Sequence, residues 1–448
     1  MQSFRPPTRT SAPGAGVQGR AQRSVLANGL RVVSIALPHL HSSLLSVFVR
    51  CGSRHETRST NGISHLLEHL LLRGSVGYPN PTSLAVAIES AGGELQGATG
   101  REYTVFQSIA HPSRLEAPFA VLGDLLARPL FNDLELEREV IREELHSEAD
   151  EQGRPLDAAE VSMAGLFGDH PIGWPIGGTP KTLAALREDD LRAWHARAYN
   201  ARNLIAVCGG PAPHEQVVRL AQQFLGGLPG GLPVEDGPPP RRAPDLPSVR
   251  FLDRPGGQTE LRLSFRCVPP RDPSFIHLRI LRRILADGPA SRLQQELVER
   301  RALAYAVGAS LTSYSDCAVF SVSAVCTPGK VRPVTTELLR IFGELRSAAV
   351  TQEELTRVLV GLRVRSDFML DSPAAAVEWF GHGELQNTPA PGVEPWLRDL
   401  DLVTAADVRR AAVTLFHRGD LVSCVAGQRT PDSAALRRLL TDGTGLSG

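Results

Sequence analysis

The sequence predicts an α+β protein made of two homologous domains, each a mostly antiparallel sheet covered by helices on one face. Three observations predict it. A Gly- and Pro-rich stretch lies near mid-chain, helix–strand pairs recur on both sides of it at one spacing, and strands and helices mix without a regular βαβ rhythm. At 448 residues the chain is long enough for two domains with full cores.

The predicted domains follow a polar N-terminal segment. Residues 1–23 are rich in Pro, Gly, Ser and Arg and lack an apolar run, which predicts a disordered lead and not a signal peptide. The linker is expected at 233–248, where Gly and Pro recur without apolar periodicity. The first domain therefore spans 24–232 and the second 249–440.

An offset of 217 residues relates the two domains to each other. Residues 190–199 and 407–416 have helical patterns, and each is followed by a buried-strand pattern, at 203–210 and 420–427. The same offset places the acidic helix 137–144 on 354–361. Because one offset serves both pairs, an internal duplication is favoured over two unrelated helix–strand units.

The remaining elements are predicted from hydrophobic periodicity. Residues 29–35, 43–49 and 260–266 are rich in β-formers and mostly alternate, so they are expected to be strands. Residues 83–91 and 113–126 are expected to be helices.

Composition narrows the class of protein. Lys+Arg and Asp+Glu both number 48, which argues against a nucleic-acid binder. The six cysteines form no C-x-x-C pair, so they are expected to be small buried hydrophobes in a reducing compartment. No window of 18 apolar residues occurs, so neither a transmembrane helix nor a membrane partner is expected. These features predict a cytoplasmic protein.

One motif indicates chemistry. In His65-Leu-Leu-Glu-His69 the two histidines are four residues apart, within a helix expected to run from an Asn61 N-cap to a stop at Gly74. Side chains at that spacing lie on one helix face and can chelate one ion, with Glu68 beside them. H-x-x-E-H is the inverzincin pattern, in which zinc needs a third protein ligand and the carboxylate can take a proton from water. The alternative is two histidines on a partly exposed helix face, with Glu68 in a local ion pair.

The flanking residues resemble the signature of a known family. Residues 62–75, G-I-S-H-L-L-E-H-L-L-L-R-G-S, are similar to the metal-binding segment of the pitrilysin family, which includes insulin-degrading enzyme, mitochondrial processing peptidase and small bacterial proteases. Three more segments fit that family in the same order: 89–99, near which substrate docks, 137–144, the helix of the third ligand, and the loop 170–179.

The resemblance implies a role for each residue of the site. His65 and His69 match the histidine ligands, Glu68 matches the general base and Glu144 the third ligand. Glu137 matches an acid that supports the site. From the residues alone, the acidic helix does not distinguish among its glutamates, and Glu143 is the rival ligand.

In the second half, residues 297–307 resemble the family segment that sends an Arg and a Tyr towards substrate, and the chain departs from the family at three positions. Tyr305 matches the tyrosine, but Val298 stands at the arginine position, with Arg300 and Arg301 as alternative sources of the guanidinium. The two other departures are Ala302, where the family has Gly, and Gln96, where the family has Asn.

By this resemblance the protein is expected to be a zinc endopeptidase with one Zn²⁺ per chain and Glu68 as base, acting on peptides, unfolded protein or a leader or precursor peptide. A homodimer, or a heterodimer with a related chain, is expected because larger relatives enclose substrate with four such domains. The alternative is a non-catalytic or half-site subunit of a heterodimeric processing peptidase.

Overall fold

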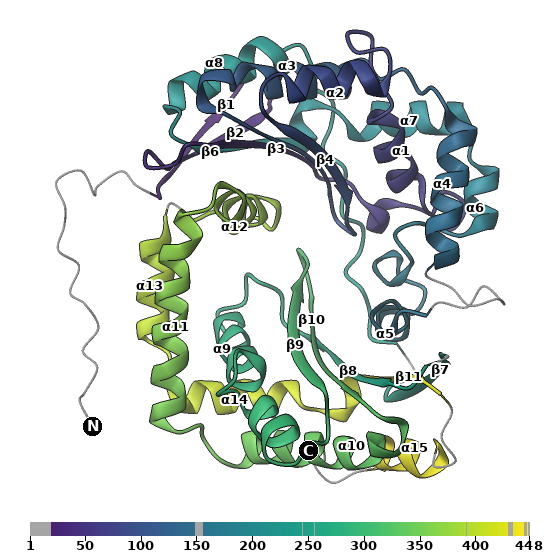
Figure 1. Cartoon of the computed structure of the whole chain (residues 1–448), viewed down its shortest axis with the longest axis vertical. Coiled ribbons are helices and arrows are strands. Elements are labelled where there is room, and N and C mark those ends of the chain that lie inside the picture. Colours follow the sequence, from purple (N-terminus) through teal and green to yellow (C-terminus); the bar gives the residue numbers. More distant parts are fainter. Residues whose placement is uncertain are drawn as a thin grey trace. The chain divides into compact units, whose positions relative to one another are not determined.

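The structure is a computed structural model that describes residues 19–147, 156–243, 245–254, 256–390, 392–428, 433–442 and 446. It contains two compact units (Figure 1). Unit 1 comprises residues 1–141, 176–236 and 360–398, and unit 2 comprises 142–175, 237–359 and 399–448. Residues 1–18 of the predicted lead lie outside the described residues, and the first strand begins at Ala21.

Unit 1 contains a six-stranded sheet in the order β1-β2-β6-β3-β5-β4. All neighbours are antiparallel except β2 and β6. The strands are β1 (Ala21–Val25), β2 (Arg31–Ala36), β3 (Ser43–Val49), β4 (Glu94–Thr99), β5 (Thr104–Ala110) and β6 (Leu204–Gly210). Its helices are α1 (Ile63–Leu71), α2 (Pro81–Glu89), α3 (Glu116–Ala127), α6 (Pro180–Ala185), α7 (Glu188–Ala198), α8 (His214–Leu225) and α12 (Pro373–Leu385).

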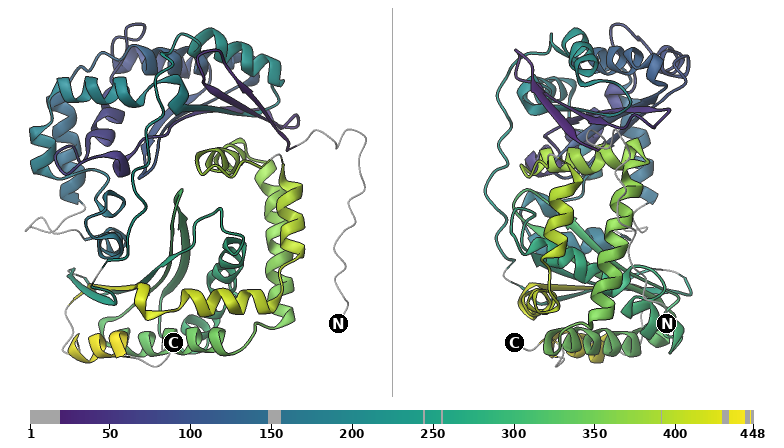
Figure 2. Two further views of the ribbon diagram at one scale, coloured as in Figure 1. Left: turned by 180° about the vertical axis from the view of Figure 1, so that it is seen from behind. Right: turned by 90° about the vertical axis from the view of Figure 1, so that its left-hand side faces the viewer.

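Both faces of this sheet are covered (Figures 1 and 2). Helices α2, α3 and α8 lie over one face, and α12 packs on the other through Val377 and Phe380. Every residue of β3 is buried as a result, with Leu44 and Phe48 directed to the α12 side. The continuous apolar pattern of this strand reflects burial on both faces.

Unit 2 contains a five-stranded sheet in the order β7-β11-β8-β10-β9, antiparallel except for β7 and β11. The strands are β7 (Ser248–Asp253), β8 (Thr259–Cys267), β9 (Ala306–Ser313), β10 (Ala318–Cys326) and β11 (Leu421–Gly427). Its helices are α5 (Ala158–Phe167), α9 (Phe275–Ala286), the π-helix η5 (Gln294–Glu299), α10 (Val331–Ser347), α14 (Ala405–Leu415) and α15 (Ser433–Asp442). Three helices join segments of the two units: α4 (Leu134–Ser147), α11 (Gln352–Leu370) and α13 (Val393–Asp401).

The strand registers confirm the predicted duplication. Val49 of β3 pairs with Leu204 of β6, and Phe265 of β8 pairs with Leu421 of β11, so the central strand pairs correspond at offsets of 216 and 217. The element order is also repeated, and it makes α1 equivalent to α9, α4 to α11 and α7 to α14.

The two halves of the chain exchange one helix. Helix α12 follows α11 in the second half yet packs on the sheet of unit 1. Its equivalent, α5, follows α4 in the first half yet packs on the sheet of unit 2, where Met163 and Leu166 contact Val422. The boundaries 24–232 and 249–440 remain predictions of how the sequence repeats, because each compact unit in space draws on both halves.

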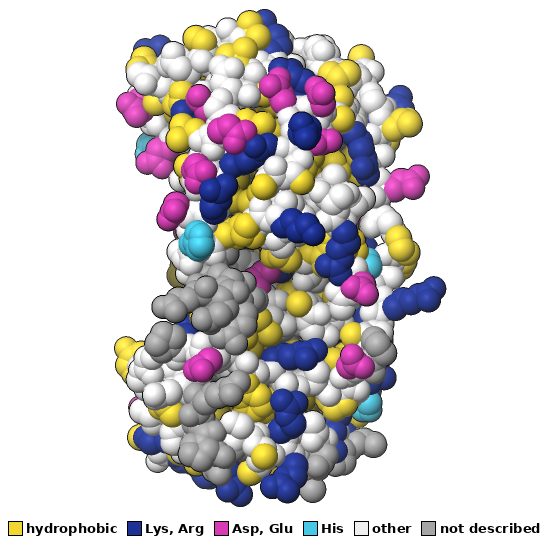
Figure 3. All heavy atoms as spheres, turned by 90° about the vertical axis from the view of Figure 1, so that its right-hand side faces the viewer, with side chains coloured by type: hydrophobic (Ala, Val, Ile, Leu, Met, Phe, Trp, Pro, Cys, Tyr) yellow, Lys and Arg dark blue, Asp and Glu magenta, His cyan; other side chains and the backbone are white. Residues whose placement is uncertain are grey.

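The surface shown in Figure 3 carries charged side chains of both signs. On the face shown in Figure 3, Lys and Arg side chains lie among Asp, Glu and scattered hydrophobic side chains. The six cysteines are unpaired, and five of them are buried, as predicted. Within the described residues, no helix is long and apolar enough to cross a membrane.

Candidate metal centre

Helix α1 carries the H-x-x-E-H motif, and its start is fixed by a buried carboxylate. The predicted Asn61 N-cap is wrong, because the cap is Gly62 with φ +97°, a left-handed conformation that favours glycine. Glu56 accepts hydrogen bonds from the backbone N–H of Gly62 at 2.8 Å and of Ser64 at 2.9 Å. It also accepts one from the Asn61 side chain at 3.0 Å, so Glu56 satisfies donors that a helix N-terminus leaves open.

Gly178 in the loop 170–179 and Gly62 at the start of α1 are needed where two backbone segments meet. A Cβ at Gly62 would lie 2.8 Å from the carbonyl oxygen of Gly177, and a Cβ at Gly178 would lie 2.4 Å from that of Asn61. The two backbones therefore pack directly against each other. This contact braces the first turn of α1, a role that the sequence did not reveal.

The two histidines project from the same face of α1. The ring centroids of His65 and His69 are 4.7 Å apart. Burial, and secondarily the proximity of His69, lowers the pKa of His65 to about 4, so its imidazole is neutral at pH 7 and offers a lone pair. His69 Nδ1 lies 2.9 Å from Glu137 Oε2, and this hydrogen bond orients Nε2 away from Glu137.

Helix α4 supplies acids to this face of α1. Glu137 and Ile141 are its buried residues, and Glu144 continues the same stripe at positions i, i+4 and i+7, whereas Glu143 points about 100° away. One donor atom from each of His65, His69 and Glu144 lies within 4.8 Å of the others. Among the described residues, these three form a group of His and Glu side chains close enough together to hold a metal ion.

This donor set fits zinc. Two imidazole nitrogens and a carboxylate oxygen are ordinary zinc ligands, and a neutral His65 needs no deprotonation. Tetrahedral bonds of about 2.0–2.2 Å place donors about 3.3–3.6 Å apart, so each pair of donors needs to approach by at most about 1.5 Å. Glu144 is exposed and can make that movement. Metal-binding histidines usually donate their other ring N–H to a carboxylate or carbonyl, as His69 Nδ1 does to Glu137 Oε2.

Glu68 lies beside this group, between α1 and strand β4. Thr99 donates a hydrogen bond from Oγ1 to Glu68 Oε2 at 3.0 Å. A Cβ at Gly97 would stand 2.4 Å from Glu68 Oε1, so only glycine allows this carboxylate its position. Gly97 and Thr99 are two residues apart and therefore lie on the same face of β4. Neither was predicted to contact Glu68.

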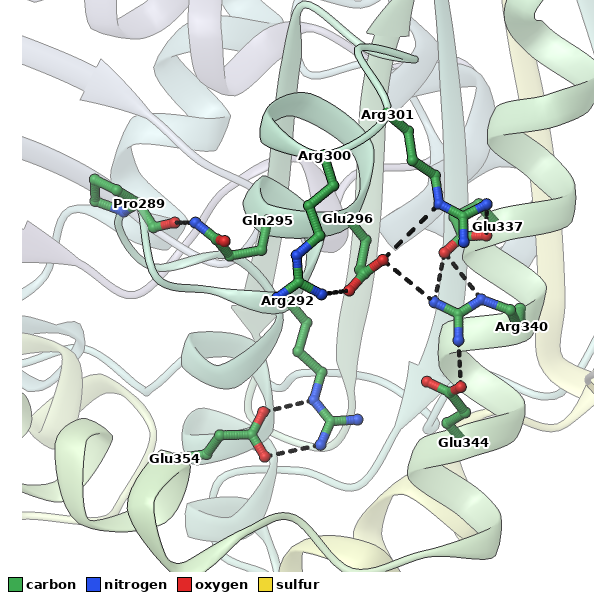
Figure 4. Close-up of polar contacts among 10 residues, drawn as sticks. All are labelled: Pro289, Arg292, Gln295, Glu296, Arg300, Arg301, Glu337, Arg340, Glu344 and Glu354. Carbon is green, nitrogen blue, oxygen red and sulfur yellow. Dashed lines mark hydrogen bonds and ion pairs between the residues drawn. The ribbon is translucent and has the colours of Figure 1, made fainter.

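The segment predicted to supply an Arg and a Tyr lies in unit 2. Tyr305 precedes β9, its side chain is exposed, and its backbone N–H donates to Val325. The equivalent of the ligand helix, α11, has Gly361 where α4 has Glu144. Glu354, at the position of Glu137, instead holds Arg292 in a two-contact ion pair at 2.7 and 2.9 Å (Figure 4).

Neither alternative arginine is an isolated side chain. Arg300 bonds Glu296 at 2.5 Å, and Arg301 Nη1 lies 3.3 Å from Glu337, within a cluster that also includes Arg340 (Figure 4). Ala302, which follows them, has φ +47°, which explains why glycine suits that position.

Two duplicated α+β units with one H-x-x-E-H helix define an inverzincin architecture. Residues 31–176 match the family described as insulinase, peptidase family M16, and residues 185–362 match the peptidase M16 inactive domain. An uncharacterized zinc protease of Mycobacterium leprae is 31% identical over 423 residues, which are 90% of this chain and 93% of that protein. Another from Streptomyces coelicolor is 28% identical over 436 residues, 96% of this chain and 94% of that protein. The chain belongs to peptidase family M16, a bacterial-type member, which confirms the resemblance to the pitrilysin family.

Solved structures share the fold. The crystal structure of a protease from Helicobacter pylori has a TM-score of 0.84 at 20% identity, covering 92% of this chain and all of that one. A peptidase M16 inactive domain from Pseudomonas fluorescens has a TM-score of 0.83 at 21% identity, covering 92% of this chain and 98% of that one.

Proposed function

We propose that this protein is a zinc-dependent endopeptidase that hydrolyses peptides or processes a leader or precursor peptide. The observation that carries the proposal is the convergence of His65, His69 and Glu144 within 4.8 Å beside a carboxylate held by Thr99. The names of the relatives, which are zinc proteases, support it. One Zn²⁺ per chain is expected, since unit 2 has no equivalent ligand set among its described residues.

The residues around the donor set have separate tasks. A bound zinc ion lowers the pKa of water and polarises a carbonyl oxygen. Glu68 accepts the proton of the attacking water and passes it to the leaving amine, because its carboxylate is fixed next to the donor set. Glu137 orients His69 through the hydrogen bond at Nδ1.

Strand β4 supplies the surface on which substrate lies. It is the terminal strand of its sheet, so one backbone edge is open to an added peptide strand. Main-chain hydrogen bonds would hold the peptide there and read little of its sequence. Gln96, on the face of β4 opposite Thr99, bonds Gln107 at 3.2 Å and takes the place of the family's Asn.

A half-site subunit is the second candidate. Val298 replaces the expected arginine, and both neighbouring arginines are engaged with Glu296 or Glu337. In this version a related chain in a heterodimer provides the arginine, whereas a self-sufficient enzyme acts as a homodimer in which Tyr305 assists.

Substitutions at three glutamates test the proposal. Glu68→Gln keeps the shape and removes the proton acceptor, so bound zinc should stay at about one per chain while peptide turnover falls at least about 10²-fold. Glu144→Gln should lose zinc, and the matched control Glu143→Gln should keep both zinc and turnover. Equal zinc content in Glu144→Gln and wild type would overturn the ligand set, and loss of zinc in Glu68→Gln would make Glu68 a ligand.

Adding a related chain that bears the Arg/Tyr pair separates the two versions. Turnover that appears only in the mixture identifies the half-site subunit. Turnover by the purified chain alone, slowed by Tyr305→Phe, identifies the self-sufficient enzyme.

A further inference from the structure

Unit 2 contains a cavity with an excess of arginine. Its volume is about 490 Å³, within the range of small-molecule sites, and it lies among α9, α14 and the end of β8. Arg242, Arg266 and Arg410 line it together with one carboxylate, Asp420. All of these residues belong to unit 2.

The connection that borders the cavity is shorter than its equivalent in unit 1. In unit 1 the segment between β3 and α1 spans 50–62, whereas the equivalent segment between β8 and α9 spans only 268–274. The longer segment packs Arg54, His55 and Glu56 into the interior beside the first residues of α1. The register that matches Val49 with Phe265 also matches Arg50 with Arg266, so the two positions are comparable.

The charged side chains of the longer segment in unit 1 have acidic partners, whereas Arg266 has none among the described residues. In unit 1, Arg54 pairs with Glu102 at 2.5 Å and His55 with Asp236 at 3.2 Å. In the described part of unit 2, Arg266 contacts two uncharged groups: it donates to the carbonyl of Pro240 at 2.7 Å and stacks 5.2 Å from the ring of Phe167. These contacts orient its guanidinium but leave its charge uncompensated.

The other two arginines have one acidic neighbour each. Arg242 Nε lies 3.5 Å from Asp420, and Arg410 pairs with Asp407 one turn earlier on α14. Burial lowers the pKa of His277, so this ring contributes no full charge at pH 7. Among the lining residues, three guanidinium groups face one carboxylate, that of Asp420, while Asp407 and Asp272 lie next to the lining through their bonds to Arg410 and Ser274. The positive charge of the lining favours an anion.

We propose that this cavity binds a small organic anion with a phosphate or carboxylate headgroup and an apolar body. The headgroup accepts hydrogen bonds from Arg242, Arg266 and Arg410, which suit planar or tetrahedral oxyanions. The apolar body lies on the remaining wall, formed by Val268, Leu278, Ala411 and Leu415. The site requires neither the metal centre nor peptidase activity.

Calorimetric titration of the full chain with phenyl phosphate, benzoate and inorganic phosphate tests the site. Phenyl phosphate or benzoate should bind at one site per chain, about tenfold tighter than inorganic phosphate, because the ring buries apolar surface. The tighter of the two aromatic anions identifies the headgroup. Absence of saturable binding by both up to 10 mM, or equal binding of inorganic phosphate, would overturn the proposal.

Variants assign the binding to the cavity. Arg242→Gln/Arg410→Gln changes two largely exposed side chains and should weaken binding at least about tenfold. Arg409→Gln is the matched control on the same helix, since Arg409 instead donates to the carbonyl of Arg346. Unchanged affinity of the double variant for the aromatic anion would show that the anion does not bind in this cavity. His65→Ala should bind the anion as wild type does. Loss of anion binding in this variant would mean that the anion binds at the metal centre.

Discussion

Glu68 shows how closely one carboxylate can be positioned by its neighbours. Helix α1 sets its backbone, Thr99 bonds one oxygen at 3.0 Å, and the missing side chain of Gly97 makes room for the other. In the proposed function Glu68 is the base, and a carboxylate held in this way would need no reorganisation before it accepts a proton.

Gly97→Ala should displace that carboxylate. The added methyl carbon would stand 2.4 Å from Glu68 Oε1, well inside van der Waals contact, so we expect turnover to fall at least about tenfold with zinc content unchanged. Peptide hydrolysis and metal analysis of the purified variant check this. Gly227→Ala, where no atom lies within 4 Å of the new Cβ, is the control and should behave as wild type. Full activity in Gly97→Ala would show that the position of Glu68 does not limit catalysis.

The burial of His195 should make the stability of the fold depend on pH. It is mostly buried, its Nε2 lies 2.9 Å from the carbonyl oxygen of Leu126, and burial lowers its pKa to about 4. An unfolded histidine titrates near pH 6.5, so the unfolded state takes up this proton first as pH falls. The contribution to stability is therefore complete above about pH 6.5 and is lost between there and pH 4, by an amount on the order of 3 kcal/mol.

Urea unfolding of wild type and His195→Gln at pH 7 and pH 4.5 measures that contribution. The wild type should lose more stability than the variant over this interval. The exposed His41→Gln is the control and should follow the wild type. Parallel losses in wild type and His195→Gln would contradict the assignment.

At the scale of elements, α12 is the helix whose position the sequence least predicts. It belongs to the second half of the chain but completes the core of unit 1, where Phe380 packs with Phe48 and Val207. The contact is apolar and fully buried, so the sheet of unit 1 depends on it for one covered face.

Phe380→Ala should lower the free energy of unfolding by about 3–5 kcal/mol, because it leaves a cavity among buried side chains. Chemical unfolding followed by circular dichroism measures the loss. Glu378→Ala changes an exposed residue of the same helix and should stay within about 0.5 kcal/mol of wild type. A similarly small loss for Phe380→Ala would mean that α12 packs only loosely on the sheet.

At the scale of the whole molecule, the exchanged helices make the two halves interdependent. Residues 24–232 include the strands of unit 1, apart from the first three residues of β1, but not α12. Residues 249–440 include the strands of unit 2, apart from Ser248 of β7, but not α5. Each half by itself therefore leaves one apolar face of its sheet open to water.

Residues 24–232 expressed alone should be insoluble or should lack cooperative unfolding, because Val33, Ile35 and Phe48 lose their cover. Coexpression with 233–448 supplies α12 and should restore soluble protein, as seen by size-exclusion chromatography. A soluble fragment 24–232 with a cooperative transition would show that this face of the sheet is stable uncovered.

The sequence by itself determined the local and the repeated features of this protein. The spacing of His65, Glu68 and His69 sets their common helix face, because the helical period is a property of the chain. The offset of 217 predicted the duplication, and the registers of β6 and β11 confirm it. For the third ligand, sequence periodicity offered several glutamates, and the family resemblance favoured Glu144.

Tertiary structure decided the contacts between distant segments. The stripe formed by Glu137, Ile141 and Glu144 depends on which side of α4 faces α1, which periodicity in a glutamate-rich helix does not determine. The bond between Thr99 and Glu68 joins residues 31 apart, and the exchange of α5 and α12 joins segments from opposite halves. Such contacts form only when elements distant in the sequence pack together, so no local pattern in the chain encodes them.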